Sequence, residues 1–398
     1  MHADQVSTLA GGANQQGVRD HNERLIMSLL LRHGALPGSE LSRLAGVSPQ
    51  TVSVILRGLE RDGYITRGTP IRGKVGKPSI PMTLAADGAY SLGLKIGRRS
   101  ADVVLMDLHG KVHSTAQSTY DYPVMSQIVA FLAQSLETIA NEMSKEAIAR
   151  LTGIGVAMPF QIWNWHNSLG TPRSVFDEWE TTDLEEKVRA ITNLPIHIVN
   201  DATAACQAEH IFGRGKVFSD YAYFFVGAFV GGGVVMSNAL VEGPGGNAGA
   251  FGSLRSTQPD GTSKQLIDTA SIFLLEAQLS AAGLDPRRLW SNQPTWTGFD
   301  EYLSPWIEQT ALELAKAALS ACSVIDFKAV VIDGGFPESV RASLVEKTRM
   351  RLVELDARGL RLPRIEEGSI GPNARAIGAA GASLFDKCFL KNSQLSAV

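Results

Sequence analysis

The sequence has little cysteine and no long apolar run. Its 398 residues include three cysteines, Cys206, Cys322 and Cys388, which lie too far apart for a disulfide framework or a Cys-x-x-Cys metal motif. No apolar stretch reaches the roughly 18 residues of a membrane-spanning helix. Residues 1–17 also lack the apolar core of a secretion signal. We therefore expect a cytoplasmic protein with no membrane partner.

The chain also has no strong excess of charge of one sign. Its formal net charge is −3, with 19% charged and 44% hydrophobic residues, as in an ordinary globular protein. The distribution is uneven, however: from Arg19 to Pro81, ten Lys/Arg accompany five Asp/Glu, an excess of five positive charges. A basic segment in an otherwise acidic chain indicates a polyanionic partner for that segment.

Three helices and a hairpin are predicted in residues 21–84. Apolar residues keep helical spacing over 21–33. Ser39 has the residue type that caps a short helix ending at Gly46, and Ser48 similarly caps a longer third helix. Two short extended segments around a Gly- and Lys/Arg-rich turn follow. This order is typical of a winged helix-turn-helix.

The chain divides into three parts in this interpretation. Residues 1–20 are polar and predict a disordered tail. Residues 21–84 form the winged helix-turn-helix, and residues 88–390 form an α/β domain. Within that domain, Ser91–Met106 and Tyr221–Met236 each read as a strand, a Gly-bearing turn and a second strand. This similarity predicts a degenerate repeat of two mixed-sheet lobes with a cleft between them.

The third helix and the basic turn are the candidate DNA-reading surface. The N-terminal part of such a helix enters the major groove, and a Gly- and Lys-bearing wing can reach the minor groove. The candidate contacts to double-stranded DNA are Gln50, Thr51, Ser53, Arg57, Arg72, Lys74 and Lys77. The alternative is that these residues form a solvated helix face and a solvated loop.

The larger domain contains several distinctive segments. They are GIGVAMP at Gly153–Pro159, VNDATAACQAEHIFGRG at Val199–Gly215, GGGVVMSNALVEGPGGNAGAFG at Gly231–Gly252, IDGG at Ile332–Gly335 and NARAIGAAGASL at Asn373–Leu384. Together they resemble the ROK family of repressors, open reading frames and sugar kinases, and the similarity runs from about residue 20 to 386. The resemblance implies an actin-like, two-lobed sugar-kinase fold, and the N-terminal winged helix resembles the repressor branch.

Asn200 and Asp201 are the candidate ligand-binding residues. In family kinases the matching Asn binds the sugar and the matching Asp removes a proton from a sugar hydroxyl, a role that a positioned carboxylate suits. Both residue types also suit the cap of a helix that starts at Ala202. We expect both roles to hold.

The phosphate-binding segments depart from the family pattern. The first loop, normally Asp-x-Gly-x-Thr, is Lys95–Arg99 here, and the second, normally Gly-Thr-Gly, is Gly227–Phe229. A cation replaces a carboxylate that would help to hold Mg²⁺, and Phe229 places bulk where the backbone approaches phosphate. We therefore predict no catalytic residue. Lys95, Arg98 and Arg99 either bind some other anion or belong to a solvated or salt-bridged strand end.

The zinc-binding segments of the family are also replaced. Glu-Ile-Gly-His is Ala250–Ser253 here, and the Cys-rich run matches Gln258–Gln265, which has no Cys or His. Zinc needs several converging N or S ligands, so we expect no metal and no cofactor, with the loop held by other means or mobile. The same replacements, with Ile267 in place of a further Glu, remove sugar contacts. Trp163 and Trp165 either stack on a ligand or pack in the fold.

These observations favour a DNA-binding regulator, a repressor of carbohydrate-related genes, with a sugar or sugar-derivative effector and no kinase activity. Two alternatives stay open. One is a sugar kinase with a fused DNA-binding head, and the other is a regulator controlled by a protein partner, in which the larger domain serves for dimerisation. A homodimer or higher homo-oligomer is expected because palindromic sites mirror two-fold protein symmetry.

Overall fold

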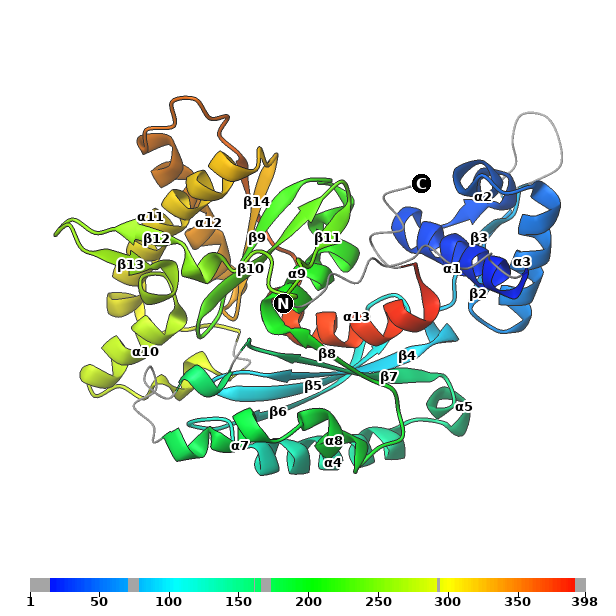
Figure 1. The fold of residues 1–398 in the computed structure, drawn as a ribbon, viewed down its shortest axis with the longest axis horizontal. Helices are drawn as coiled ribbons and strands as arrows, with labels where there is room; N and C mark the ends of the chain where they lie inside the picture. The colour runs from blue at the N-terminus through cyan, green and yellow to red at the C-terminus, as the bar shows by residue number, and fades with distance from the viewer. Residues whose placement is uncertain (1–14, 71–78, 161, 166–172, 292–293, 391–398) are drawn as a thin grey trace, which may run out of the picture. The chain divides into compact units, whose positions relative to one another are not determined.

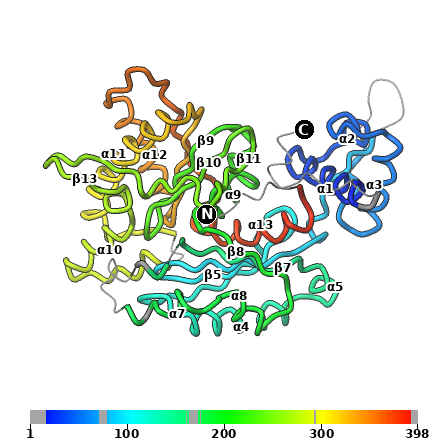
Figure 2. Tube along the Cα trace, in the orientation of Figure 1, coloured from blue at the N-terminus to red at the C-terminus, as the bar shows by residue number. Residues whose placement is uncertain are grey.

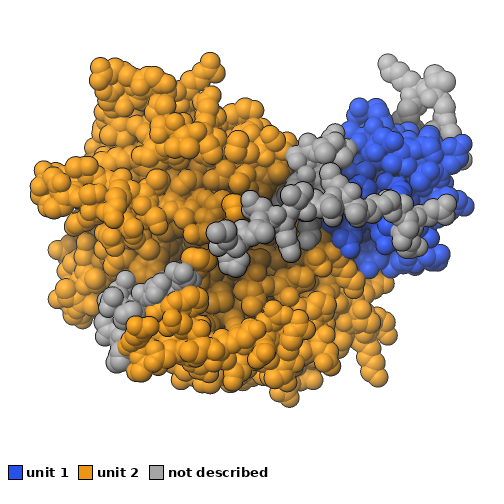
Figure 3. Space-filling model, viewed as in Figure 1, with its two compact units in different colours: residues 1–85, 388–390, 398 blue, residues 86–387, 391–397 orange. Residues whose placement is uncertain are grey.

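The computed structural model describes residues 15–70, 79–160, 162–165, 173–291 and 294–390. The chain forms two compact units, which Figure 3 shows in different colours. The first unit contains residues 1–85 and 388–390, and the second contains residues 86–387. None of the described helices combines the length and apolar composition that crossing a bilayer requires.

The first unit is a winged helix-turn-helix built on three helices and a small antiparallel sheet. Its elements are α1 (Gln15–His33), β1 (Leu36–Pro37), α2 (Gly38–Ala45), α3 (Pro49–Arg61), β2 (Ile65–Arg67) and β3 (Pro81–Leu84). Strand β3 lies in the middle of the sheet, between β1 and β2. Buried Leu25, Ile26 and Leu30 of α1 contribute to the core. The predicted architecture of this part is therefore confirmed.

Two details of this unit differ from the prediction. Helix α1 begins at Gln15, so residues 15–20 are helical rather than part of a tail, and an ion pair of 2.8 Å between Arg19 and Glu23 supports the added turn. Ser39 lies inside α2, because Pro37 occupies the cap position and no side chain caps that helix. Gly46, at φ 64°, does end α2 as predicted, since this backbone conformation favours glycine.

The last residues that the structure describes belong to the first unit. Cys388, Phe389 and Leu390 are buried there, and the Leu390 backbone N–H donates to Ser28 Oγ at 3.0 Å. The α/β domain therefore ends at Lys387 in the structure, whereas the sequence predicts its continuation to residue 390.

The second unit contains two five-stranded mixed sheets with the same topology (Figure 1). The first sheet has the order β6-β5-β4-β7-β8, and the second has the order β11-β10-β9-β14-β15. In each, the central strand pairs antiparallel with the next strand in sequence and parallel with a later one. The strands are β4 (Tyr90–Ile96), β5 (Ser100–Asp107), β6 (Val112–Thr119), β7 (Leu151–Met158), β8 (Ile196–Asn200), β9 (Tyr221–Val226), β10 (Val230–Met236), β11 (Ala239–Val241), β14 (Ala329–Gly334) and β15 (Arg364–Glu367). The predicted two-lobe repeat is confirmed.

Helices cover the outer face of each sheet, and two further helices lie between the sheets (Figure 1). Helices α4 (Met125–Glu142) and α8 (Leu184–Arg189) share an apolar core with the first sheet, next to the short helices α5 (Lys145–Ile148) and α7 (Asp177–Thr181). Helices α10 (Ile272–Ala281), α11 (Asp300–Val324) and α12 (Glu338–Glu354) share a larger core with the second sheet. Helices α9 (Asp201–Phe212) and α13 (Ala374–Cys388) occupy the space between the sheets.

Glycine allows α13 to approach its neighbours closely, and Figure 2 shows its trace next to that of α9. A Cβ atom at Gly378 would lie 1.8 Å from the Ala204 carbonyl oxygen of α9. A Cβ atom at Gly155 of β7 would lie 1.7 Å from the carbonyl oxygen of Ala379. The small residues of α13 therefore hold it directly against both α9 and the first sheet.

Candidate functional site

Helix α3 presents a polar face and an apolar face. Ser48 Oγ accepts a hydrogen bond of 3.2 Å from the Thr51 N–H and so caps α3, as the sequence predicts. Buried Val52, Ile55 and Leu59 attach the helix to the unit. The predicted DNA-reading residues of this helix, Gln50, Thr51, Ser53 and Arg57, are all exposed.

The charges around this face separate into paired and unpaired groups. Four of the basic residues counted in the sequence form ion pairs within the unit: Arg19 with Glu23, Arg43 with Glu40, Arg61 with Asp62 and Arg67 with Glu60. Arg57 pairs with no carboxylate of the described chain, and its Nε donates to the Ser53 carbonyl at 3.2 Å. The wing residues Arg72, Lys74 and Lys77 lie outside the described residues.

A pocket in the second unit, the β8–α9 pocket, contains the predicted ligand-binding pair where β8 ends and α9 begins. Asn200 Oδ1 accepts hydrogen bonds of 3.0 Å from the backbone N–H groups of both Ala202 and Thr203. Asn200 is therefore the cap of α9. Asp201 instead points its Oδ2 at Arg375 Nη1 of α13, 3.2 Å away. The predicted cap is thus formed by Asn200, whereas Asp201 is engaged with Arg375.

The other walls of the β8–α9 pocket carry few polar side chains. Asn247 and Ser253 line it, together with Ala250 and Ile267 at positions where the family resemblance implies polar sugar contacts. The remaining lining residues are Arg98, Pro159, Phe160, Ala202, Phe225, Ala228, Phe229, Val230, Gly231, Gly232, Gly252 and Arg375. A bound ligand would find its polar partners mainly at the α9 end and at the two arginines.

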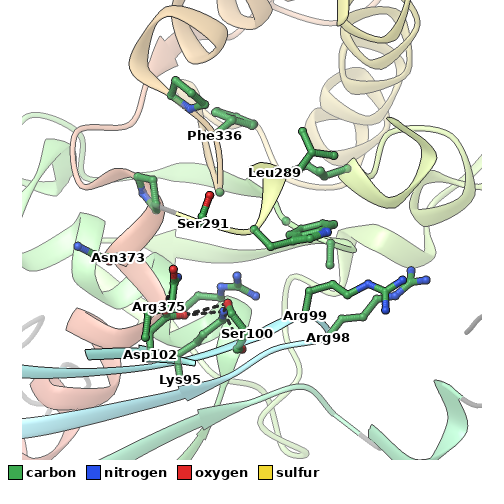
Figure 4. A pocket seen from close by; sticks show the side chains of 18 of the residues that line it. Lys95, Arg98, Arg99, Ser100, Asp102, Leu289, Ser291, Phe336, Asn373 and Arg375 are labelled. Atoms are coloured by element: carbon green, nitrogen blue, oxygen red, sulfur yellow. Dashed lines mark hydrogen bonds and ion pairs between the residues drawn. The ribbon is translucent and has the colours of Figure 1, made fainter. Parts of the chain in front are cut away.

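A second pocket, the β4–β5 pocket, lies beside the segment that replaces the first phosphate loop (Figure 4). Lys95 Nζ donates to Asp102 Oδ2 at 2.7 Å and to Ser100 Oγ at 2.7 Å. Burial lowers the pKa of Lys95 to about 8 despite the adjacent carboxylate. Burial alone would raise the pKa of Asp102, but Lys95 and a hydrogen bond of 2.6 Å from Gln117 lower it overall. Lys95 is thus held in an internal ion pair.

The neighbouring arginines differ from each other. Arg99 forms an ion pair with the buried Glu276 of α10. Arg98 lies against a pair of aromatic rings, with its Cζ 5.1 Å from the centroids of Phe229 and Phe273, which are 5.3 Å from each other. Phe229, which replaces the last glycine of the second phosphate loop, therefore supplies a cation–π contact to Arg98.

The backbone of the second loop is also engaged within the protein. The Gly227 N–H donates to the Phe229 carbonyl at 3.3 Å. The Gly227 carbonyl accepts from Ile272 N–H at 3.0 Å, which ties the loop to the start of α10. Gly227 thus uses both its N–H and its carbonyl within the protein, and Lys95 and Phe229 stand where the family resemblance implies a carboxylate and a glycine.

The segment that replaces the zinc-binding run is a hairpin. Strands β12 (Arg255–Thr257) and β13 (Ser263–Gln265) pair antiparallel, and Asp260 Oδ1 accepts from the Thr262 N–H in the turn. Phe251 packs on Phe224 with ring centroids 4.7 Å apart. Within the described ranges, no three His, Cys, Asp or Glu side chains converge as metal ligands. The residues present do not fit a zinc ion, and hydrogen bonds with apolar packing hold the loop instead.

Trp163 lies outside both pockets described above. It packs against the apolar core of the first lobe and lines a separate groove with Met158, Phe160 and Leu240. The side chain of Trp165 lies outside the part of the chain that the structure describes.

The motif residues Glu209 and Gly213 have a structural role at the other end of α9. Glu209 is fully buried, and its carboxylate accepts from the backbone N–H groups of Arg214, Ser369 and Ile370 at 2.8–3.2 Å. A Cβ atom at Gly213 would lie 2.4 Å from Glu209 Oε1. Glycine is required at position 213 because the backbone there passes too close to the Glu209 carboxylate to leave room for a side chain.

Sequence reasoning missed the partners of the charged residues. None of these partners was a candidate: Asp102 pairs with Lys95, Glu276 with Arg99, Arg375 with Asp201, and Phe273 contacts Arg98. Arg375 gave one usable signal, because it is a cation within the otherwise small and apolar segment Asn373–Leu384. The others depend on contacts between strands and helices that spacing in the sequence does not show.

The winged helix-turn-helix and the repeated five-stranded sheets define a chain that joins a DNA-binding type of fold to a sugar-kinase type of fold. Residues 19–66 match the model of a winged helix-turn-helix DNA-binding family, and residues 91–263 match that of the ROK family. The chain belongs to the ROK family and carries an N-terminal winged helix-turn-helix.

Individual relatives extend this result at low identity. The chain is 26% identical to a protein named y4fQ of Sinorhizobium fredii, over 92% of each chain. It is 23% identical to the xylose repressor of Bacillus subtilis, over 61% of this chain and 62% of that protein. A crystal structure of a ROK-family transcriptional regulator, a homologue of the Escherichia coli MLC protein, has a TM-score of 0.64 at 17% identity, covering 96% and 100% of the two chains. That similarity supports the fold of both parts.

Proposed function

We propose that this protein is a DNA-binding transcription regulator, a repressor of carbohydrate-related genes, that responds to a small ligand in the cleft of its second unit. The observation that carries the proposal is the exposed polar face of α3, with Gln50 and Arg57 free of carboxylate partners within the described chain. Gln can pair bidentately with adenine, and Arg with guanine or phosphate. The repressor name of the Bacillus subtilis relative supports the regulatory direction.

Ligand control is supported by the path of α13. This helix starts in the cleft, where Arg375 meets Asp201, and its last residue, Cys388, is part of the first unit. A ligand that changes the Arg375–Asp201 contact would thus act on the helix that leads into the DNA-binding unit. A ligand shifts a protein between two states only when its binding free energy differs between those states.

We further propose that the protein is not a kinase and acts as a homodimer or higher homo-oligomer. The observation against phosphoryl transfer is that Lys95 and Phe229 occupy phosphate-loop positions, where Lys95 forms an internal ion pair with Asp102 and Phe229 contacts Arg98. The alternative of a sugar kinase with a DNA-binding head requires those positions to receive a nucleotide. The alternative of control by a protein partner requires no bound nucleotide or small ligand, because the second unit would then serve for dimerisation.

The experiment that tests the proposal is a selection of bound duplexes from a random library by the purified full-length protein. We expect one recurrent, two-fold symmetric sequence. Recovery of no recurrent sequence would contradict the regulator. In parallel, an ATP-consumption assay with a panel of sugars should show no turnover; sugar-dependent turnover that Asp201→Asn abolishes would establish the kinase alternative.

A further inference from the structure

The wall of the β4–β5 pocket carries more positive than negative groups. Its four cations are Lys95, Arg98, Arg99 and Arg375. Three carboxylates balance three of them: Asp102 pairs with Lys95, Glu276 with Arg99 and Asp201 with Arg375. Arg98 forms no ion pair with any carboxylate of the described ranges. One positive charge at this wall therefore remains uncompensated.

Arg98 is also withdrawn from water. The residue is 6% exposed, and its Nε and Nη1 atoms have no hydrogen-bond partner in the part of the chain that the structure describes. Burial lowers the pKa of Arg98 to about 10, although the negative charge of Glu276 acts to raise it. Phe229 and Phe273 offer only their ring faces, and a desolvated guanidinium remains costly unless an anion pairs with it.

Arg98 lies where the two pockets meet, so an anion paired with it would lie there too. Arg98, Ala228 and Arg375 line both the β8–α9 pocket and the β4–β5 pocket. Arg375 has an unpartnered, buried Nε atom, as does the indole Nε1 of Trp290 in the β4–β5 pocket. An anion between the pockets would meet donors from β4–β5, α13 and the segment after α10 (Figure 4 shows Arg98, Arg99 and Arg375 around the β4–β5 pocket), and Asn200 and Asp201 line the adjoining β8–α9 pocket.

We infer that the effector of this cleft is an anionic sugar derivative, whose carboxylate or phosphate monoester pairs with Arg98 and whose hydroxyl groups lie toward Asp201. This inference rests on the proposed function, because it specifies the ligand of the same cleft. A carboxylate or phosphate matches the planar donor geometry of a guanidinium. Arg375 screens the ligand anion from Asp201, and Arg99 screens it from Glu276.

The charge balance also limits how many negative charges a bound ligand can bring to this wall. A nucleoside triphosphate would bring three or more negative charges, whereas this wall has one uncompensated cation. Lys95 cannot supply another without leaving Asp102 buried and unpaired. A single anionic group therefore fits the wall, and a neutral sugar would leave Arg98 without a counter-ion.

The test is binding to the full-length protein at constant ionic strength, measured by thermal shift and calorimetry. The probes are matched sets in which D-glucose or D-xylose is offered as the neutral sugar, as the sugar acid and as the sugar monophosphate, with inorganic phosphate as the simplest anion. Arg98→Gln removes the charge, Arg98→Lys keeps it, and Arg287→Gln is a control at an arginine paired with Asp285 on the surface. Circular dichroism checks that each variant is folded.

We expect an anionic member of a set to bind at least about tenfold more tightly than its neutral parent, because a charged hydrogen bond contributes roughly that factor or more. Arg98→Gln should lose this gain while its affinity for the neutral parent stays the same, and Arg98→Lys should keep part of it. Binding of only the acid, or only the phosphate, supports the inference and identifies the anion.

Three outcomes would overturn the inference: equal affinity for neutral and anionic members, anion binding that Arg98→Gln leaves intact, and no binding by any probe. If a neutral sugar alone binds, and Asp201→Ala abolishes its binding, the inference fails while the proposed function stands. If no probe binds but the protein selects a recurrent DNA sequence, DNA recognition stands without this ligand. Failure of the DNA selection would instead remove the proposed function itself.

Discussion

Asp201 and Arg375 join the two helices that lie between the sheets: Arg375 Nη1 is 3.2 Å from Asp201 Oδ2, at the first turns of α13 and α9. Arg375 also lies over the Phe225 ring, with its Cζ 4.9 Å from the centroid. The aspartate that resembles the proton-accepting residue of the family kinases is therefore held by a cation of the helix that leads into the DNA-binding unit.

Replacement of Asp201 tests whether this pair takes part in ligand binding. Asp201→Ala should weaken binding of the effector by about 1.5–3 kcal/mol, or roughly ten- to a hundredfold, because a hydrogen-bonding charge is removed. DNA binding without effector should be retained. Calorimetry with a ligand found by screening measures the change, and the surface variant Asp285→Ala is the control. Equal affinity in wild type and Asp201→Ala would mean that the residue serves only the α9–α13 contact.

The close packing of α13 predicts opposite effects for two glycines of one helix. Gly378→Ala places a methyl group against the Ala204 carbonyl and should lower the free energy of unfolding by about 1–3 kcal/mol or more. Gly381→Ala meets its nearest atom, on Phe212, at 4.0 Å, so it should be neutral or stabilising by up to about 1 kcal/mol from helix propensity. Denaturant unfolding compares them. Similar stability of the two variants would contradict the packing described.

A buried carboxylate at the end of β14 makes stability depend on pH. Burial, with the nearby Glu209, raises the pKa of Asp333 to about 6 from 3.8. The folded state therefore holds this proton more tightly than the unfolded state, and the contribution of Asp333 to stability falls as the pH rises from about 4 to 6, by about 3 kcal/mol in all. Relative to Asp333→Asn, the wild type should lose stability across this range. A difference between the two proteins that does not change with pH would refute the assignment.

Metal content tests the account of the β12–β13 hairpin. Because Ala250, Phe251 and Ser253 offer no zinc ligands, the purified protein should contain no stoichiometric zinc, and a chelator should leave its melting temperature unchanged. Elemental analysis measures the first and thermal unfolding the second. About one tightly bound zinc per chain would show that the loop is held differently.

Local signals in the sequence predicted local structure well. Ser48 caps α3 and Gly46 ends α2 because cap chemistry depends on a few adjacent residues. The two strand–turn–strand segments predicted the repeated lobes because each carries a continuous apolar pattern. Ser39 failed as a cap because Pro37 already fixes the chain at the start of α2. Strand β6 escaped notice because its mostly polar, half-buried or exposed residues give no such pattern.

The candidate site was predicted only in part. Asn200 and Asp201 were found from a motif, but their different roles follow from Arg375, which is 174 residues away in sequence. The same holds for Arg98, whose two aromatic neighbours come from separate elements. Pairings of this kind depend on how strands and helices pack, and the residues themselves carry no local sign of them.

The most direct test of the account is the affinity of full-length Gln50→Ala for the duplex selected by the wild type, measured by fluorescence anisotropy. We predict a loss of about 1–3 kcal/mol on that sequence and almost none on random DNA, since Gln50 would contact a base edge. Gln278→Ala, at an exposed glutamine of α10, should bind as the wild type does. Lys74→Ala and Lys77→Ala should weaken binding to all sequences and flatten its salt dependence. Unchanged affinity of Gln50→Ala, Lys74→Ala and Lys77→Ala for the selected duplex would contradict the assignment of this surface to DNA.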